Sequence, residues 1–218
     1  MEKGDFIEFD YTGKTTNGFV FDTTIKDVAT SNHIESKSVY KPAIMCLGQG
    51  HFMQGLDEAL MQKDVGIGKH TFTIPAEKAF GKKDAKKIQT VPLSKFTKEK
   101  LQPYPGMQIN VDGQIASVKR VSGGRVLVDL NHPLAGLDVV YDVDIKQKVT
   151  DVKLKVESYI HNSFGPVKHE IKENTLTIFV KTLPEETIKE SLEKDIMARI
   201  PEIKTITFTI DKDEENKQ

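Results

Sequence analysis

The sequence lacks the features that would place it in several large classes of protein. It contains a single cysteine, Cys46, which excludes an intramolecular disulfide. No apolar run reaches the ~18 residues that a helix needs to span a bilayer, and Met1–Asp5 lack the charged, apolar and small-residue regions of a secretion signal. We therefore expect a cytoplasmic protein that has no membrane as a partner.

An excess of charge of one sign is missing as well. The chain carries 31 Lys and Arg residues against 32 Asp and Glu residues, for a formal net charge of -1. Such a balance creates no overall field that would attract nucleic acid or an anionic membrane surface. We expect no nucleic-acid partner.

Metal ligands in a recognisable arrangement are also absent from the sequence. The six histidines show no paired spacing of the kind that binds a metal ion. Cys46 lies in the apolar run Ile44–Leu47, where a buried and unreactive thiol is expected. A metal-delivery protein would need clustered histidines or cysteines, and that reading is disfavoured. We predict no metal site and no cofactor.

The patterns that are present indicate an α+β protein with more than one domain, for which 218 residues suffice. Apolar and polar residues alternate over residues 7–11, which predicts a strand, and residues 12–18 read as the turn after it. The same alternation over residues 70–75 and 139–145 predicts two further strands of one sheet.

Between the first and second of these strands, one helix and one irregular stretch are expected. Met53, Leu56 and Leu60 recur at helical spacing and predict a short amphipathic helix. The polar stretch over residues 23–38 is expected to form an ordered surface bulge.

Residues 84–131 have hairpin signals of their own. Asp112-Gly113 separates two strand-like runs, and Gly123-Gly124 precedes a third run over residues 125–130. Three prolines favour turn or edge structure in the entry segment: Pro92, Pro103 and Pro105. This segment is predicted to be a small β-rich domain.

The last third of the chain predicts a compact α+β unit. Thr182 followed by Glu185 fits a capping box, and the apolar stripe over residues 188–200 predicts a helix after it. Alternation predicts strands over residues 152–156, 176–180 and 205–210.

Several separated segments together resemble the FKBP-type peptidyl-prolyl isomerases, in particular their SlyD-like and long-chain archaeal branch. The resemblance covers roughly residues 3–147 and implies an FKBP-like antiparallel sheet with a short helix and a β-rich domain inserted in the flap. The segments that carry it are Gly18-Phe19-Val20-Phe21-Asp22-Thr23-Thr24, Gly55-Leu56-Asp57-Glu58-Ala59-Leu60, Ala79-Phe80-Gly81, Asn131-His132-Pro133-Leu134-Ala135-Gly136 and Val140-Tyr141-Asp142-Val143.

The resemblance also implies a division into domains. The isomerase domain is expected to comprise residues 1–83 plus 132–148, the insert-in-flap domain residues 84–131, and the small C-terminal α+β domain residues 149–218. The apolar stripe of the last domain fits self-association as a homodimer and fits a packed monomeric domain equally well, so both stay open.

Candidate site residues follow from the resemblance, position by position. Tyr11 and Asp22 match a tyrosine and an aspartate at the edge of the cleft, where they would position substrate through polar contacts. Where many small members have tryptophan, this chain has Leu56. The implied catalytic residues are Tyr11, Asp22, Phe80 and Tyr141, and the implied substrate-binding residues are Phe21, Phe52, Met53, Leu56, His132 and Leu134.

The implied function is isomerisation of X-Pro bonds in unfolded or proline-containing polypeptide clients, without a covalent nucleophile. The insert would bind these clients. Its apolar residues either form the client-binding face or fill its own core: Ile88, Val91, Leu93, Phe96, Leu101 and Met107. The alternative function is a non-enzymatic holdase chaperone that uses the FKBP fold only to bind peptides.

Overall fold

A computed structural model describes residues 1–34, 40–50, 52–62, 65–111 and 113–211 of the chain. Residues 35–38 of the predicted surface bulge, Asp112 of the predicted hairpin and His51, one of the six histidines, lie outside the described residues. The chain divides into two compact units. The first comprises Met1–Lys14, Phe19–Phe72 and Tyr141–Gln218, and the second comprises Thr15–Gly18 and Thr73–Val140.

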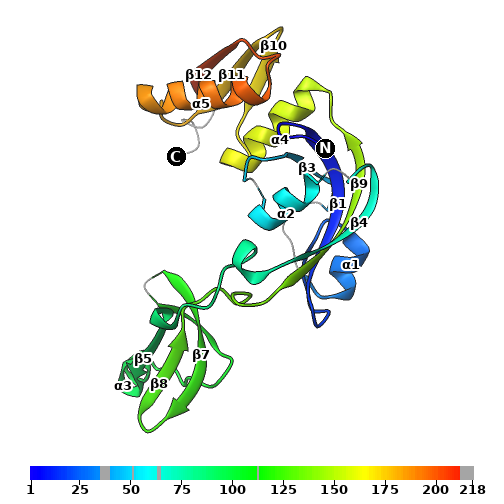
Figure 1. Ribbon diagram of the computed structural model, residues 1–218. Helices are drawn as coiled ribbons and strands as arrows, with labels where there is room; N and C mark the ends of the chain where they lie inside the picture. The colour runs from blue at the N-terminus through cyan, green and yellow to red at the C-terminus, as the bar shows by residue number, and fades with distance from the viewer. Residues whose placement is uncertain (35–39, 51, 63–64, 112, 212–218) are drawn as a thin grey trace. The chain divides into compact units, whose positions relative to one another are not determined.

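A five-stranded sheet forms the base of the first unit (Figure 1). Its strands lie in the order β2-β1-β9-β4, and β3 also pairs with β1. The three strands predicted from alternation are therefore confirmed. The predicted turn over residues 12–18 is too long, because β1 continues to Thr15 through an irregularity between Gly13 and Lys14. The strands are β1 (Phe6–Thr15), β2 (Val20–Thr23), β3 (Ala43–Cys46), β4 (Gly68–Ile74) and β9 (Val139–Lys148).

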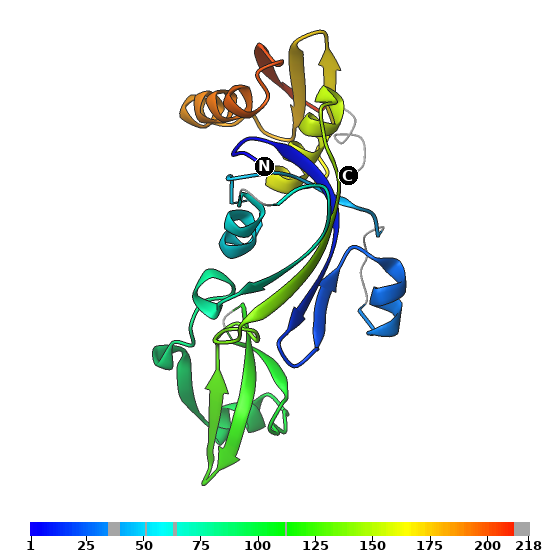
Figure 2. The same cartoon turned by 45° about the vertical axis from the view of Figure 1, so that its right-hand side comes forward.

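Two short helices accompany this sheet. Helix α2 (Gln54–Leu60) confirms the short amphipathic helix predicted from the sequence, and it lies on the concave side of the sheet (Figures 1 and 2). Helix α1 (Lys26–Ser31) lies within the stretch predicted as a surface bulge, and Ala29 is its buried residue. Within the described residues 23–34, the sequence analysis therefore missed this helix.

The C-terminal part of the first unit contains a second sheet with the order β10-β11-β12. Strands β11 and β12 are parallel and are connected through α5, whereas β10 and β11 are antiparallel. The elements are α4 (Val152–Phe164), β10 (His169–Lys172), β11 (Thr175–Val180), α5 (Glu186–Arg199) and β12 (Thr205–Ile210).

Two local predictions for this part are wrong. Residues 152–156 were predicted as a strand and form the first turns of α4, because the Asp151 carboxylate caps the helix by accepting the Leu154 N–H at 2.9 Å. The capping box of Thr182 and Glu185 does not form, since α5 begins at Glu186 and its N-terminus has no side-chain capping hydrogen bond.

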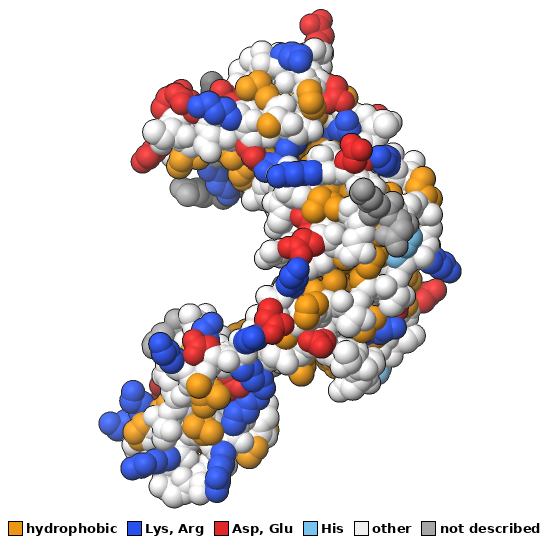
Figure 3. Space-filling model, viewed as in Figure 1, with side chains coloured by type: hydrophobic (Ala, Val, Ile, Leu, Met, Phe, Trp, Pro, Cys, Tyr) orange, Lys and Arg blue, Asp and Glu red, His pale blue; other side chains and the backbone are white. Residues whose placement is uncertain are grey.

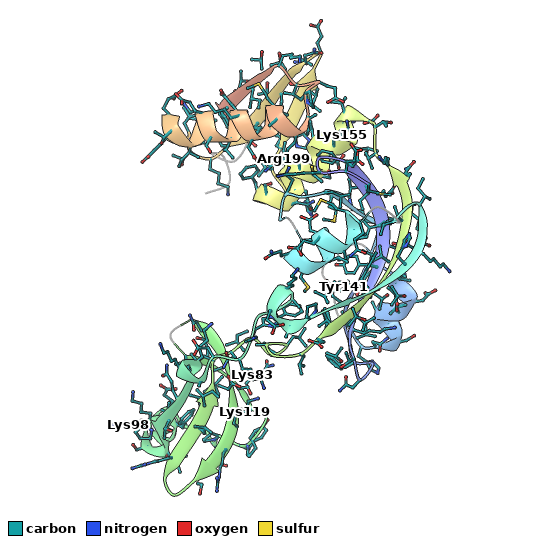
Figure 4. The ribbon with its side chains drawn as sticks, in the orientation of Figure 1. Lys83, Lys98, Lys119, Tyr141, Lys155 and Arg199 are labelled. Atoms are coloured by element: carbon teal, nitrogen blue, oxygen red, sulfur yellow. The ribbon has the colours of Figure 1, made fainter. Side chains whose placement is uncertain are left out.

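One apolar core joins α4, α5 and both sheets of this unit. Phe6 and Cys46 of the first sheet belong to the same buried cluster as residues of α4, β11 and α5. Burial raises the pKa of the Cys46 thiol to about 11, which fits the expected unreactive side chain. On α5, Arg199, labelled in Figure 4, pairs with Asp195 and donates to the Tyr159 hydroxyl of α4 at 3.0 Å.

The second unit contains a four-stranded antiparallel sheet with the order β5-β8-β7-β6. The predicted hairpin between residues 108 and 118 is confirmed, and Pro92 ends the edge strand β5. The elements are β5 (Ile88–Pro92), α3 (Leu93–Lys98), β6 (Gln108–Val111), β7 (Gln114–Ser122) and β8 (Arg125–Asp129), preceded by the short 3-10 turns Ala76–Lys78 and Ala85–Lys87.

The structure also settles which apolar residues of this unit are buried. Phe96 lies in its core, and Val91, Leu93 and Met107 pack against that core. Ile88 and Leu101 are each 38% exposed, and Tyr104 and Ile115 are 63% and 66% exposed. Lys and Arg side chains lie around the apolar patches of this unit (Figure 3). The basic side chains labelled in Figure 4 include Lys98 on α3 and Lys119 on β7.

The two chain segments that lead into and out of this β-rich domain are hydrogen-bonded to each other. The Asp84 N–H donates to Asn131 Oδ1 at 2.9 Å, and Asn131 Nδ2 donates to the Asp84 carbonyl at 3.0 Å. Burial opposes ionisation of Asp129, but the backbone and side-chain N–H groups of Asn131 hold the pKa of that carboxyl below its usual value. Gly136 N–H donates to the Gly81 carbonyl at 2.7 Å. These contacts close the stem of the domain.

In the part of the chain that the structure describes, every helix is too short or too polar to cross a membrane.

Ile160→Ala tests the shared core of the first unit. Ile160 is 1% exposed on α4, so its truncation should lower the free energy of unfolding by about 2–4 kcal/mol. Urea unfolding measures the change, and Lys153→Ala on the exposed side of the same helix is the matched control. Equal stability of the two variants would contradict this packing.

Candidate active site

A hydrogen-bonded pair, Tyr11 and Asp22, lies where β1 and β2 adjoin. The Tyr11 hydroxyl donates to Asp22 Oδ2 at 2.7 Å. Tyr11 is 8% exposed, whereas Asp22 is half-buried. The phenol ring is thus fixed in the protein and its polar end points to a carboxylate that remains accessible to solvent.

Two threonines after Asp22 hold the backbone of Tyr11 in place. Thr23 Oγ1 donates to the Tyr11 carbonyl at 2.9 Å, and the Tyr11 N–H donates to Thr24 Oγ1, also at 2.9 Å. The Thr24 N–H donates to the same carbonyl at 3.0 Å. The sequence analysis gave these threonines no role, although they stand in the segment that carries the family resemblance.

Aromatic rings surround the pair. The Tyr11 and Phe52 ring centroids are 5.1 Å apart in an edge-on arrangement, and Tyr11 and Tyr141 are 5.9 Å apart. Phe21 packs edge-on against Tyr141 at 5.9 Å. Phe9, which the sequence analysis did not select, lies 6.0 Å from Phe52. Edge-on contacts of this kind stabilise fixed ring orientations and form an apolar wall. Tyr141 is labelled on β9 in Figure 4.

Gly13 allows these rings to approach β1. A Cβ at this position would lie 2.8 Å from Phe21 Cε2 and 3.0 Å from Tyr141 Cε1, so the Phe21 ring would have to shift and the Tyr141 ring would have to move slightly. The sequence analysis placed Gly13 in a turn and missed this role. No periodic pattern reveals it, because the constraint comes from side chains on β2 and β9.

The residues that lead into α2, together with α2 itself, contribute to the site and to the core beside it. Leu56 is fully buried at 0% exposure and therefore belongs to the core, whereas Phe52 and Met53 are half-buried. The buried Asp57 carboxylate accepts the Gly48 N–H at 2.7 Å and the Gly50 N–H at 3.2 Å. These bonds tie the loop that precedes Phe52 to the helix.

The remaining predicted site residues belong to the second unit. Phe80 and His132 stack with ring centroids 4.5 Å apart and planes 2° from parallel. The Leu134 N–H donates to His132 Nδ1 at 3.2 Å. The structure thus brings together Tyr11, Phe21, Asp22, Phe52 and Tyr141 in one cluster, and Phe80, His132 and Leu134 in another.

The environment of the two tyrosines keeps them protonated. Burial is the main cause that raises the pKa of Tyr11, followed by its hydrogen bond to Asp22 and the charge of that carboxylate. Burial and the Asp22 charge also raise the pKa of Tyr141. Tyr11 is therefore a neutral hydrogen-bond donor over the whole physiological range. Among the described residues, no group of three or more His, Cys, Asp or Glu side chains is placed to hold a metal ion.

Comparisons with known proteins agree with this geometry. Residues 1–97 match the family model of the FKBP-type peptidyl-prolyl cis-trans isomerase, and residues 89–134 match that of the FKBP26 IF domain. A short-type peptidyl-prolyl cis-trans isomerase of Methanocaldococcus jannaschii is 34% identical over 147 residues, which cover 67% of this chain and 92% of that protein.

Two bacterial relatives are similar over shorter stretches. The FKBP-type 16 kDa peptidyl-prolyl cis-trans isomerase of Escherichia coli is 31% identical over 48% of this chain and 72% of that protein. The FKBP-type peptidyl-prolyl cis-trans isomerase SlyD of Helicobacter pylori is 27% identical over 54% of this chain and 64% of its own length. The chain belongs to the FKBP-type peptidyl-prolyl cis-trans isomerases, an enzyme family, and the resemblance read from its sequence is confirmed.

Gly13→Ala should displace Phe21 and Tyr141 and so reduce isomerase activity about tenfold or more, with a loss of stability of about 1–3 kcal/mol. Acceleration of a proline-limited refolding reaction and urea unfolding measure the two effects. Gly66→Ala is the control, because a Cβ there meets nothing within 4 Å and its φ is not positive. A Gly13 variant as active as the control would refute the close ring packing.

The raised pKa of Tyr11 predicts how stability depends on alkaline pH. In the unfolded chain a tyrosine ionises near pH 10, whereas folded Tyr11 stays protonated, so the free energy of unfolding should fall as pH rises above about 10. Tyr11→Phe should remove part of that fall. Asp22→Asn should lower the pKa of Tyr11, which ultraviolet difference titration detects; an unchanged titration would contradict the electrostatic coupling.

Proposed function

We propose that this protein speeds cis-trans isomerisation of X-Pro bonds in unfolded or partly folded polypeptides, and that the cluster around Tyr11 and Asp22 is the catalytic cleft. The observation that carries the proposal is the hydrogen-bonded pair inside a wall of aromatic rings, in a chain of this enzyme family.

The chemistry required is rotation about an amide bond. The planar amide loses its resonance when twisted, which produces a barrier of ~18–20 kcal/mol and makes the uncatalysed reaction slow. No bond to the protein has to form. A catalyst needs only to bind the twisted amide better than either planar form.

The residues of the cleft divide this task between them. The apolar wall of Phe21, Phe52 and Tyr141 would hold the proline ring and exclude water, which favours the less polar twisted carbonyl. The Tyr11 hydroxyl and the Asp22 carboxylate would orient the carbonyl that precedes proline. Phe80 stays a predicted catalytic residue, and His132 and Leu134 stay predicted substrate-binding residues.

We also propose that residues 84–131 form an insert-in-flap domain that captures clients for this cleft. The hydrogen bonds between Asp84 and Asn131 support these limits, since they join the first and last residues of the proposed domain. Exposed Tyr104 and Ile115 supply apolar contact area for a client. Residues 84–131 carry eight Lys or Arg residues against four Asp or Glu residues, which gives the domain an excess of positive charge.

The rest of the organisation stands as prediction. Residues 1–83 plus 132–148 would form the isomerase domain and residues 149–218 the C-terminal domain. Action in the cytoplasm, the absence of nucleic-acid and membrane partners, and a homodimer formed through the C-terminal domain likewise stay predictions.

Variants of the cleft test the catalytic proposal in a proline-limited refolding assay. Asp22→Ala should lower the acceleration about tenfold to a hundredfold because the orienting pair is lost. Asp27→Ala, an exposed carboxylate on α1, is the control. An intact protein that suppresses aggregation but leaves the slow refolding phase unchanged would reject the isomerase function in favour of the holdase alternative.

Variants of the insert test client capture in the same assay. Replacing Tyr104 and Ile115 together by serine should lower the acceleration several-fold, since both side chains are exposed and their loss leaves the core intact. Ile67→Ser in the first unit, where Ile67 is 67% exposed, is the matched control. If the insert variant refolds the client as fast as the wild type does, these side chains do not capture it.

A further inference from the structure

A cavity of about 620 Å³ adjoins the proposed cleft. Tyr11, Asp22 and Phe52 line it, and so do residues of α4 in the C-terminal part of the chain. All of these belong to the first compact unit. The volume lies within the range of about 300–1,000 Å³ that is usual for ligand sites. The cavity is therefore large enough for several residues of a client beside the proline.

One face of α4 is turned toward this cavity. Five residues of α4 line the cavity, and they follow the spacing of a single helical face: the other four stand three, four, seven and eight positions after Leu154. The other face of the helix is buried in the apolar core through Val156, Tyr159 and Ile160. The lining residues are Leu154, Glu157, Ser158, His161 and Asn162.

Helix α4 is capped at its N-terminus and tied to the first sheet near its C-terminus. Asp151 caps its N-terminus, and near its C-terminus Asn162 Nδ2 donates to the Ile44 carbonyl of β3 at 2.9 Å. Strand β3 in turn pairs with β1, which carries Tyr11. Both figures of the ribbon show α4 next to β3 (Figures 1 and 2). The C-terminal end of the helix is therefore held against the sheet that carries Tyr11.

The charges along the cavity select a type of client. Among the residues that the structure describes, three carboxylates line it, those of Glu8, Asp22 and Glu157, against one lysine, Lys41. Apolar surface from residues such as Ile44 and Leu154 lies between them. A polypeptide segment with lysine or arginine near the proline complements such a surface, and one with acidic residues does not.

We propose that α4 forms a specificity subsite of the isomerase, which binds the client residues that flank the proline and favours basic ones. The proposal rests on the proposed isomerase function and adds to it a substrate preference set by the C-terminal part of the chain. Glu157 is the specificity-determining residue, since it is the carboxylate that α4 contributes to the lining.

Two otherwise identical peptides test the proposal, each with one Leu–Pro bond flanked on both sides by lysines or by glutamates. Exchange NMR gives the kcat/KM of isomerisation for each peptide with the full-length protein. The wild type should prefer the lysine peptide, and Glu157→Gln should lower the ratio of the two values about two- to fourfold. Added salt should reduce the preference of the wild type.

Two further variants sharpen the comparison. His161→Glu adds a carboxylate to the same face of α4 and should raise the ratio. Glu190→Gln on α5 makes the same change of net charge as Glu157→Gln outside the cavity lining, and it should leave the ratio unchanged.

The outcomes separate this inference from the function on which it rests. If the wild type turns over both peptides and the ratio is the same in Glu157→Gln and His161→Glu as in the wild type, the subsite is refuted and the isomerase function stands. If the wild type accelerates neither peptide, the isomerase function fails and this proposal fails with it.

Discussion

Strand β1 is paired along its length with strands from distant parts of the chain, and both the fold and the site depend on that pairing. Its first half pairs with β3 and its second half with β2, while β9 returns after the inserted domain to lie beside it. Tyr11 sits where these partners meet. Its backbone is bonded to Thr23 at the end of β2 and to Thr24 after it, and its ring contacts Tyr141 of β9. The hydrogen-bonded pair of Tyr11 and Asp22 therefore forms only when three separate segments have reached their places.

Much of this arrangement was predictable from local pattern and from the family resemblance. Alternation of apolar residues located β1, β4 and β9, because each has one buried face. The helical spacing of Met53, Leu56 and Leu60 located α2. The resemblance supplied Tyr11 and Asp22 as partners, and they are hydrogen-bonded in the structure. Their part in catalysis, like that of the other candidate residues, stays a prediction.

Features that depend on distant contacts were not predictable in this way. Apolar and polar residues alternate over residues 152–156 as they do in a strand, but five residues are too few to distinguish the two-residue repeat of a strand from the 3.6-residue repeat of a helix. The cap at Asp151 stabilises the helix. The requirement for glycine at position 13 comes from two rings that approach from β2 and β9. The cavity beside Tyr11 needs α4, which follows β9 in sequence and packs on β3 in the fold.

The closed stem at Asp84 and Asn131 has a consequence for how this enzyme tolerates so large an addition. The two ends of the inserted segment are held together by their own hydrogen bonds. The entropy cost of bringing β4 and β9 together is therefore close to that of closing a short loop. The length of chain beyond the stem adds little to the cost of closing that loop. Evolution can then lengthen, shorten or exchange what lies beyond the stem while the five-stranded sheet folds as before.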